Sequence, residues 1–146
     1  MKLFKIAAVG AVLVAGAAFA ADRTDPNAKM REEVMEEIGG AIGTLGKMAK
    51  GEMAYDAAAA EAAKAKMIEE AGAIATDFAT QGEADPASEA KPEIWTSWDD
   101  FLKKADALKA AATAADVSSA EAIGASLGAL GGACKDCHTT YRVAKE

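Results

Sequence analysis

Apolar residues recur every three or four positions along most of this chain, which is the spacing of a buried face on an α-helix. The first such pattern predicts a helix that begins at Asp25-Pro26, with Asp25 as N-cap and Pro26 in the first helical position. Gly51 is expected to end it. The predicted inward stripe of this helix consists of Met30, Val34, Ile38, Ile42, Leu45 and Met48.

Three further helices are predicted. Asp56 is the expected N-cap of the second, and the polar stretch from Thr80 to Pro92 is the expected long loop. The third begins near Pro92 or Thr96, and Ser118-Ser119-Ala120-Glu121 is a capping box that opens the fourth. The inward positions are Met67, Ile74 and Phe78 in the second helix, Trp95, Trp98, Phe101, Leu102, Ala105 and Leu108 in the third, and Ile123, Leu127, Leu130, Cys134, Cys137 and Tyr141 in the fourth. Four such helices joined by mostly short connections predict an all-α fold, an antiparallel four-helix bundle.

The N-terminus has the pattern of a secretory signal peptide. Lys2 and Lys5 precede an uncharged apolar run from Ile6 to Ala21, and Ala18-Phe19-Ala20 is a cleavage site of the A-x-A type. We expect residues 1–20 to be removed after Ala20, which leaves one domain over residues 21–146 in the periplasm. The run is shorter than the roughly 20 residues of a membrane helix, so a retained anchor is the less favoured alternative.

The net charge of the chain limits the classes of partner that it is expected to bind. Loss of the two leader lysines takes the formal net charge from −7 to −9. A strongly acidic protein is unsuited to nucleic acid or to anionic membranes. It suits a basic docking partner, although acidity also serves solubility.

A CxxCH motif, Cys134-Lys135-Asp136-Cys137-His138, contains both cysteines and the only histidine. This is the attachment motif of a c-type haem, in which two thiols add to the porphyrin vinyl groups and the imidazole binds the iron. On a helix the three side chains project toward one face. Because the cysteines continue the core-facing stripe of the last helix, one covalent haem c is expected inside the bundle, near the C-terminal helix.

Two other chemistries use such cysteines. A thiol–disulfide oxidoreductase needs a dithiol, usually in a βαβ context, and no strand pattern precedes this motif. A structural zinc site needs about four nitrogen or sulfur ligands, more than the cysteines and histidine provide. Apart from the dithiol alternative, the sequence offers no catalytic constellation, and the protein is not expected to be an enzyme.

The chain resembles the cytochrome c-prime family, the class II c-type cytochromes, which includes low-spin methionine-ligated relatives. The resemblance covers nearly all of residues 21–146. It is carried by Met48-Ala49-Lys50-Gly51-Glu52 with Tyr55-Asp56, by Pro92-Glu93-Ile94-Trp95, and by Gly131 followed by Cys134 to Arg142.

The resemblance implies haem c linked to Cys134 and Cys137, with His138 as the proximal iron ligand. It also implies that Arg142 lies close to the proximal face and that Trp95 packs near the haem edge. From the residues alone, Arg142 could equally be a solvated cation at a helix C-terminus, and Trp95 a core residue. Arg31 is a further candidate cofactor contact. The pair Arg31-Glu32 stands where many high-spin members carry Arg-Gln, which favours the low-spin type.

In this family a side chain of the first helix covers the distal face of the haem, and the matching residue is Met35. In low-spin members a methionine here binds the iron, which suits electron transfer to an unidentified redox protein. In high-spin members an apolar side chain blocks the site without binding, and the five-coordinate haem takes NO or CO. We expect Met35 to be an iron ligand. In one alternative it covers the iron without binding it, as in the high-spin members. In the other it is an ordinary helix residue beside the apolar stripe. The stretch Ile38-Gly39-Gly40-Ala41-Ile42-Gly43 is rich in small residues, which would let the helix approach the haem closely. The protein is expected to be a monomer or a homodimer.

Overall fold

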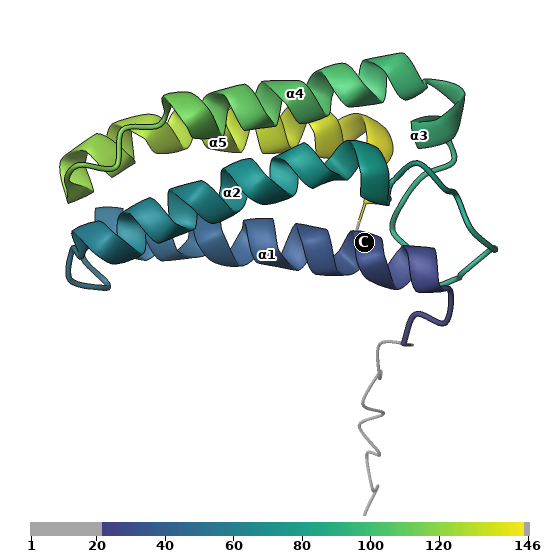
Figure 1. Cartoon of the computed structure of the whole chain (residues 1–146), viewed down its shortest axis with the longest axis horizontal. Helices are drawn as coiled ribbons and strands as arrows, with labels where there is room; N and C mark the ends of the chain where they lie inside the picture. Colours follow the sequence, from purple (N-terminus) through teal and green to yellow (C-terminus); the bar gives the residue numbers. More distant parts are fainter. Residues whose placement is uncertain (1–21, 145–146) are drawn as a thin grey trace, which may run out of the picture.

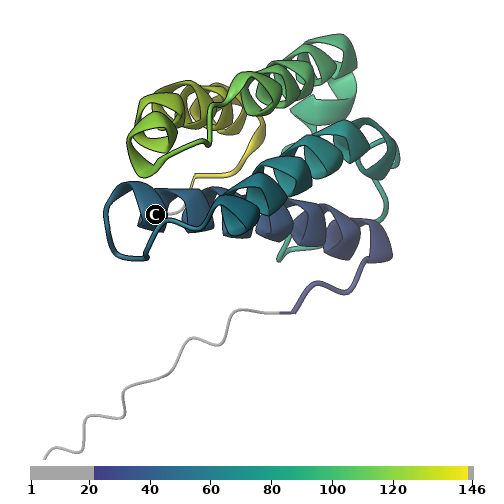
Figure 2. The same cartoon turned by 60° about the vertical axis from the view of Figure 1, so that its left-hand side comes forward.

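Four long helices form an antiparallel bundle in the computed structural model, which describes residues 22–144 (Figure 1). They are α1 (Pro26–Ala49), α2 (Ala57–Asp77), α4 (Trp98–Ala114) and α5 (Ala120–Tyr141), with a single turn, α3 (Glu93–Thr96), before α4. The pair α4 and α5 lies over the pair α1 and α2 (Figure 2). The predicted all-α bundle is therefore confirmed, while the predicted leader, residues 1–20, lies outside the described residues.

Helix α1 begins and ends as the sequence predicts. The Asp25 carboxylate accepts a hydrogen bond from the Ala28 N–H at 2.8 Å, and Pro26 occupies the first turn. At the other end Gly51 has a φ of 71°, the left-handed conformation that glycine adopts most easily after a helix.

One position of the predicted α1 stripe is wrong. Met30 is 46% exposed, whereas the neighbouring Arg31 is only 5% exposed. Val34 is buried, and stepping back three residues from it reaches Arg31 while stepping back four reaches Met30. Arg31 is the residue that is buried, because its guanidinium packs against the rings of Phe78 and Trp95.

The third and fourth predicted helices differ slightly from expectation at their starts. Both predicted starts of the third helix are used, because α3 begins beside Pro92 and α4 begins just after Thr96. The N-cap of α5 is Ser119, whose hydroxyl accepts from the Ala122 N–H at 3.1 Å, and not Ser118. The Ser118 N–H instead donates to the Asp116 carboxylate in the preceding turn.

The core has two parts, one toward each end of the bundle. One contains Leu45, Met67 and Leu130, and the other contains Ile38, Phe78 and Phe101. Cys134, Cys137 and Met35 pack against the second part. The predicted site residues therefore gather at the end of the bundle where α1 begins and α5 ends.

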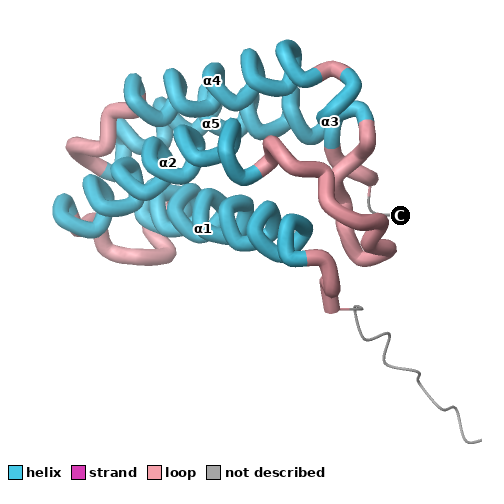
Figure 3. Tube along the Cα trace, turned by 45° about the vertical axis from the view of Figure 1, so that its right-hand side comes forward, coloured by secondary structure: helices cyan, strands magenta, loops and turns pink. Residues whose placement is uncertain are grey.

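The loop between α2 and α3 returns past the C-terminal end of α5 (Figure 3). The Lys91 N–H donates to the Tyr141 carbonyl at 3.0 Å, and the Val143 N–H donates to the Glu89 carbonyl at 2.8 Å. These bonds flank an antiparallel bridge between Ala90 and Arg142. Within residues 22–144, no helix combines the length and apolarity needed to cross a membrane.

Candidate functional site

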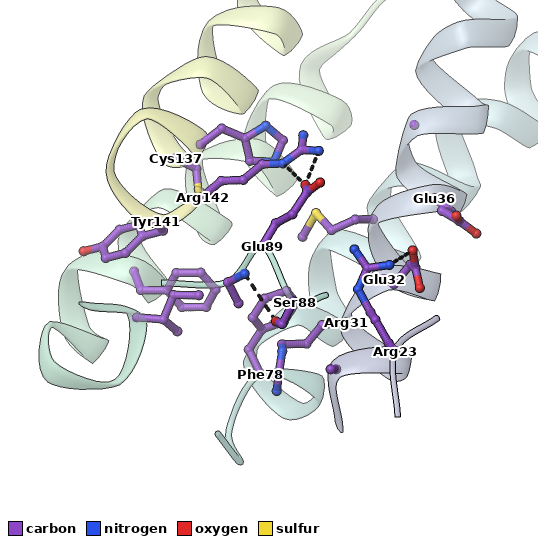
Figure 4. Close-up of a pocket in the computed structure, with 17 residues that line it drawn as sticks. Arg23, Arg31, Glu32, Glu36, Phe78, Ser88, Glu89, Cys137, Tyr141 and Arg142 are labelled. Atoms are coloured by element: carbon purple, nitrogen blue, oxygen red, sulfur yellow. Dashed lines mark hydrogen bonds and ion pairs between the residues drawn. The ribbon is translucent and has the colours of Figure 1, made fainter. Parts of the chain in front are cut away.

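A cavity of about 370 Å³ lies between α1, α5 and the α2–α3 loop (Figure 4). Helix α5 contributes Cys137 and His138 to its wall, and α1 contributes Met35. Phe78 and Phe101 add apolar surface, with ring centroids 5.3 Å apart. The structure thus brings together, around one space, side chains that are about a hundred residues apart in the sequence.

The two cysteines are half-buried and form no disulfide. Cys137 lines the cavity, while Cys134 packs against the same apolar cluster one turn earlier on α5. Burial raises the pKa of the Cys137 thiol to about 11 and also raises the pKa of Cys134. Dithiol redox proteins depend on the opposite shift, because the thiolate is the reactive form. The site is therefore poorly suited to thiol–disulfide exchange.

His138 is half-buried beside Cys137 and lines the cavity. Burial lowers the pKa of the imidazole, and the nearby Arg142 cation lowers it further, whereas Glu89 opposes the shift. The lowered pKa favours the neutral imidazole, which is the form that binds metals.

Met35 reaches the cavity from the wall opposite α5. Its side chain is half-buried and packs against the core cluster that contains Phe101. Gly39, one turn later, also lines the cavity and adds no side chain to it. Gly40 instead borders a second groove, between α1 and α2. Of the three glycines in the stretch expected to allow a close approach (Gly39, Gly40 and Gly43), only Gly39 lines the cavity.

Arg31 is the buried cation of the cavity wall. Its Nη1 donates to the Thr80 carbonyl at 3.0 Å, and its guanidinium lies 5.1 Å from the Trp95 ring centroid. Its Nε is buried and has no hydrogen-bond partner among the described residues. Burial lowers the pKa of Arg31, with Asp25 and Asp85 opposing. Because a buried donor without a partner is costly, this nitrogen fits an acidic group bound in the cavity.

Trp95 packs against the guanidinium of Arg31 but does not line the cavity. Its Nε1 donates to the Phe78 carbonyl at 2.7 Å. Trp95 therefore touches two residues that line the cavity, Arg31 and Phe78, without lining it itself.

Arg142 lines the cavity beside His138 and forms an ion pair with Glu89. Sequence reasoning did not identify Glu89, nor Arg23, which lines the cavity and pairs with Glu32. Both lie outside the long helices, where no periodicity predicts which way a side chain points. The only feature of the sequence that could have indicated these two residues is that each is a charged residue near the end of a predicted helix.

Comparisons with known proteins identify the class to which this fold and motif belong. A protein-family model described as Cytochrome C' matches residues 27–142. Cytochrome c-556 of Agrobacterium fabrum is 36% identical over 148 residues, which cover 99% of this chain and 97% of that protein. The structure of cytochrome c' from Rhodobacter sphaeroides is similar with a TM-score of 0.73 at 31% identity, covering 82% of this chain and 96% of that one.

A third relative carries a ligand in its name. The nitric oxide complex of a variant of cytochrome c prime from Alcaligenes xylosoxidans is 26% identical, with a TM-score of 0.69, and covers 81% of this chain and 94% of that one.

The protein is a c-type cytochrome, and the chain belongs to the cytochrome c' family. Its cofactor is a single haem c, and the predicted family and cofactor are confirmed. The donor set fits the group: two thiols and an imidazole on α5, apolar side chains such as Phe78 and Phe101 in the cavity wall, and a buried arginine nitrogen that lacks a partner among the described residues. Function through a haem, in electron transfer or gas binding, follows from the family.

Proposed function

We propose that this protein is a periplasmic electron carrier in which Met35 and His138 are the two axial ligands of the haem iron. The observation that carries the proposal is that both side chains line the same cavity, one from α1 and one from α5. When bound, the haem supplies an iron that accepts and releases one electron. A Met/His ligand pair raises the reduction potential, which suits this role.

The other residues of the cavity have roles in holding the cofactor. Cys134 and Cys137 would form the two thioether links that hold the haem to α5. Arg31 lines the cavity and would hold an acidic group of the haem, with Trp95 supporting its guanidinium. The apolar side chains of Phe78 and Phe101 exclude water from the ring.

A five-coordinate protein that binds NO or CO is the alternative. The relative solved as a nitric oxide complex favours it, since that protein has the same fold. In this arrangement Met35 would cover the distal face without binding the iron, and its removal would change the rate of gas entry. The two functions differ in one bond, between the Met35 sulfur and the iron.

Export precedes haem attachment in this proposal. Residues 1–20 form the signal peptide, cleaved after Ala20, and residues 21–146 form the haem domain in the periplasm. The acidic charge suits a basic redox partner. We assign the protein electron transfer and no catalytic reaction.

The first test is whether the haem is covalent and carried by these cysteines. The protein is produced in a host with the cytochrome c maturation machinery, denatured, and analysed by mass spectrometry. We expect one haem to remain attached and the mature chain to begin at Ala21. C134S and C137S should each retain one fewer thioether link, and the double variant should retain no covalent haem. A denatured wild-type protein with two titratable thiols would overturn the proposal and favour the dithiol alternative.

A further inference from the structure

Glu89 and Arg142 form an ion pair at the cavity wall. The Glu89 carboxylate accepts from Arg142 Nε at 2.6 Å and also contacts Arg142 Nη2. Figure 4 shows Glu89 reaching from the α2–α3 loop toward the Arg142 guanidinium at the end of α5. One carboxylate oxygen is thus the partner of both nitrogens, and hydrogen bonds between two ionised groups are shorter and stronger than those between neutral groups.

The backbone around this pair is also fixed. The Glu89 carbonyl accepts from the Val143 N–H, and the next residues are joined by the bond from the Lys91 N–H to the Tyr141 carbonyl. Exposed ion pairs contribute little when both side chains must first be ordered. Here the two backbone hydrogen bonds already hold both segments in place. The side chain of Glu89 is 28% exposed and that of Arg142 is 42% exposed.

The pair lies next to His138. The Arg142 N–H donates to the His138 carbonyl at 3.1 Å, and the three side chains line the same cavity. Charges in the wall of a cavity act on a metal bound inside it, so the Arg142 cation and the Glu89 anion would act on the iron in opposite directions.

We propose that Glu89 is a positioning residue that holds Arg142 beside the proximal side of the haem, and that this pair sets the reduction potential of the iron. The inference rests on the haem site proposed above. Reduction adds one negative charge at the iron, so a nearby cation favours the ferrous state and a nearby anion favours the ferric state. With both present the effects largely cancel, and Glu89 determines how much of the Arg142 charge reaches the iron.

The test is potentiometric titration of haem-loaded variants. E89Q removes the anion of the pair and should raise the potential, while R142Q removes the cation and should lower it. The E89Q/R142Q double variant should return close to the wild-type value. We expect each single change to alter the ferrous-to-ferric ratio at a fixed potential about threefold to tenfold, where tenfold corresponds to about 59 mV for one electron.

E93Q is the matched control, because it removes the same charge from an exposed position four residues further along. It should leave the potential nearly unchanged. A residue that only braces the loop would change the unfolding midpoint and not the potential, so unchanged potentials in loaded E89Q and R142Q would overturn this inference alone. Shifts of the same sign in both variants would also overturn it. If E89Q does not load with haem, R142Q still tests the sign. A wild-type protein without covalent haem would overturn the proposed function as well.

Discussion

The guanidinium of Arg31 lies 5.1 Å from the ring centroid of Trp95, and this contact joins three separate elements of the protein. Arg31 belongs to α1 and Trp95 to α3, and the indole Nε1–H of Trp95 donates to the carbonyl of Phe78, the C-cap of α2. Arg31 also lies 5.9 Å from the Phe78 ring. One indole therefore supports both the buried cation of the cavity wall and the end of the helix beside it.

W95F tests this arrangement. Phenylalanine keeps most of the ring but loses the donor to the Phe78 carbonyl and weakens the contact with Arg31. We expect the free energy of unfolding of the haem-loaded protein to fall by about 1 to 3 kcal/mol, measured by urea denaturation. W98F is the control, since Trp98 stacks on Phe101 at 5.4 Å and should lose less from the same substitution. Equal losses in the two variants would contradict the role given to the Trp95 donor.

M35A tests the axial ligand. Loss of the sulfur should convert the absorption spectrum to the high-spin type and lower the reduction potential. We expect a tenfold to hundredfold change in the ferrous-to-ferric ratio, about 60 to 120 mV. M30A is the matched control, because Met30 is on the same helix but is 46% exposed and away from the cavity. An unchanged spectrum in M35A would show that Met35 is not a ligand.

Tyr141 links stability to pH in the alkaline range. Its hydroxyl donates to the Asp100 carboxylate at 2.6 Å, and burial, with this hydrogen bond, raises its pKa to about 12. The unfolded chain releases this proton near pH 10, before the folded protein does. The contribution of Tyr141 to stability is therefore complete below pH 10 and is lost as the pH rises toward 12.

Y141F should accordingly be less stable than wild type by about 1 to 3 kcal/mol at pH 7, because Asp100 loses a donor. The difference between the two proteins should shrink between pH 10 and pH 12. Urea denaturation at several pH values measures this difference. A gap that stays constant across that range would contradict the link to Tyr141 ionisation.

Two glycines of the first helix region are expected to respond in opposite directions to alanine. Gly51 has a φ of 71°, so G51A should destabilise the protein by about 1 kcal/mol. Gly46 is inside α1, and a Cβ there would meet nothing within 4 Å. G46A should therefore stabilise the protein by up to about 1 kcal/mol. Thermal unfolding of both variants checks the contrast, and destabilisation by G46A would indicate that its side of α1 is covered by something else.

The sequence was sufficient to predict the helices because their signals are local. Asp25, Asp56 and Gly51 act within a few residues of where they stand, and the apolar stripes repeat with the helix period. The burial of Arg31 in place of Met30 could not be predicted this way. It depends on Phe78 and Trp95, which arrive from α2 and α3 only when the bundle is assembled.

The site was predictable in part for the same reason. The CxxCH motif places its own side chains on one helix face, and the family resemblance pointed to Met35, which does line the cavity with His138. Glu89 had no such signal, because its position follows from a loop held by two backbone bonds to the end of α5. The ligand roles of Met35 and His138 stay predictions.

The most direct measurement is the absorption spectrum of the purified, haem-loaded protein after reduction with dithionite, before and after exposure to CO. If Met35 and His138 fill both axial positions, the reduced protein shows a sharp, resolved α band that CO leaves almost unchanged. A broad, merged band that shifts on addition of CO would mean an open distal position. That result would contradict the electron-carrier account and favour gas binding.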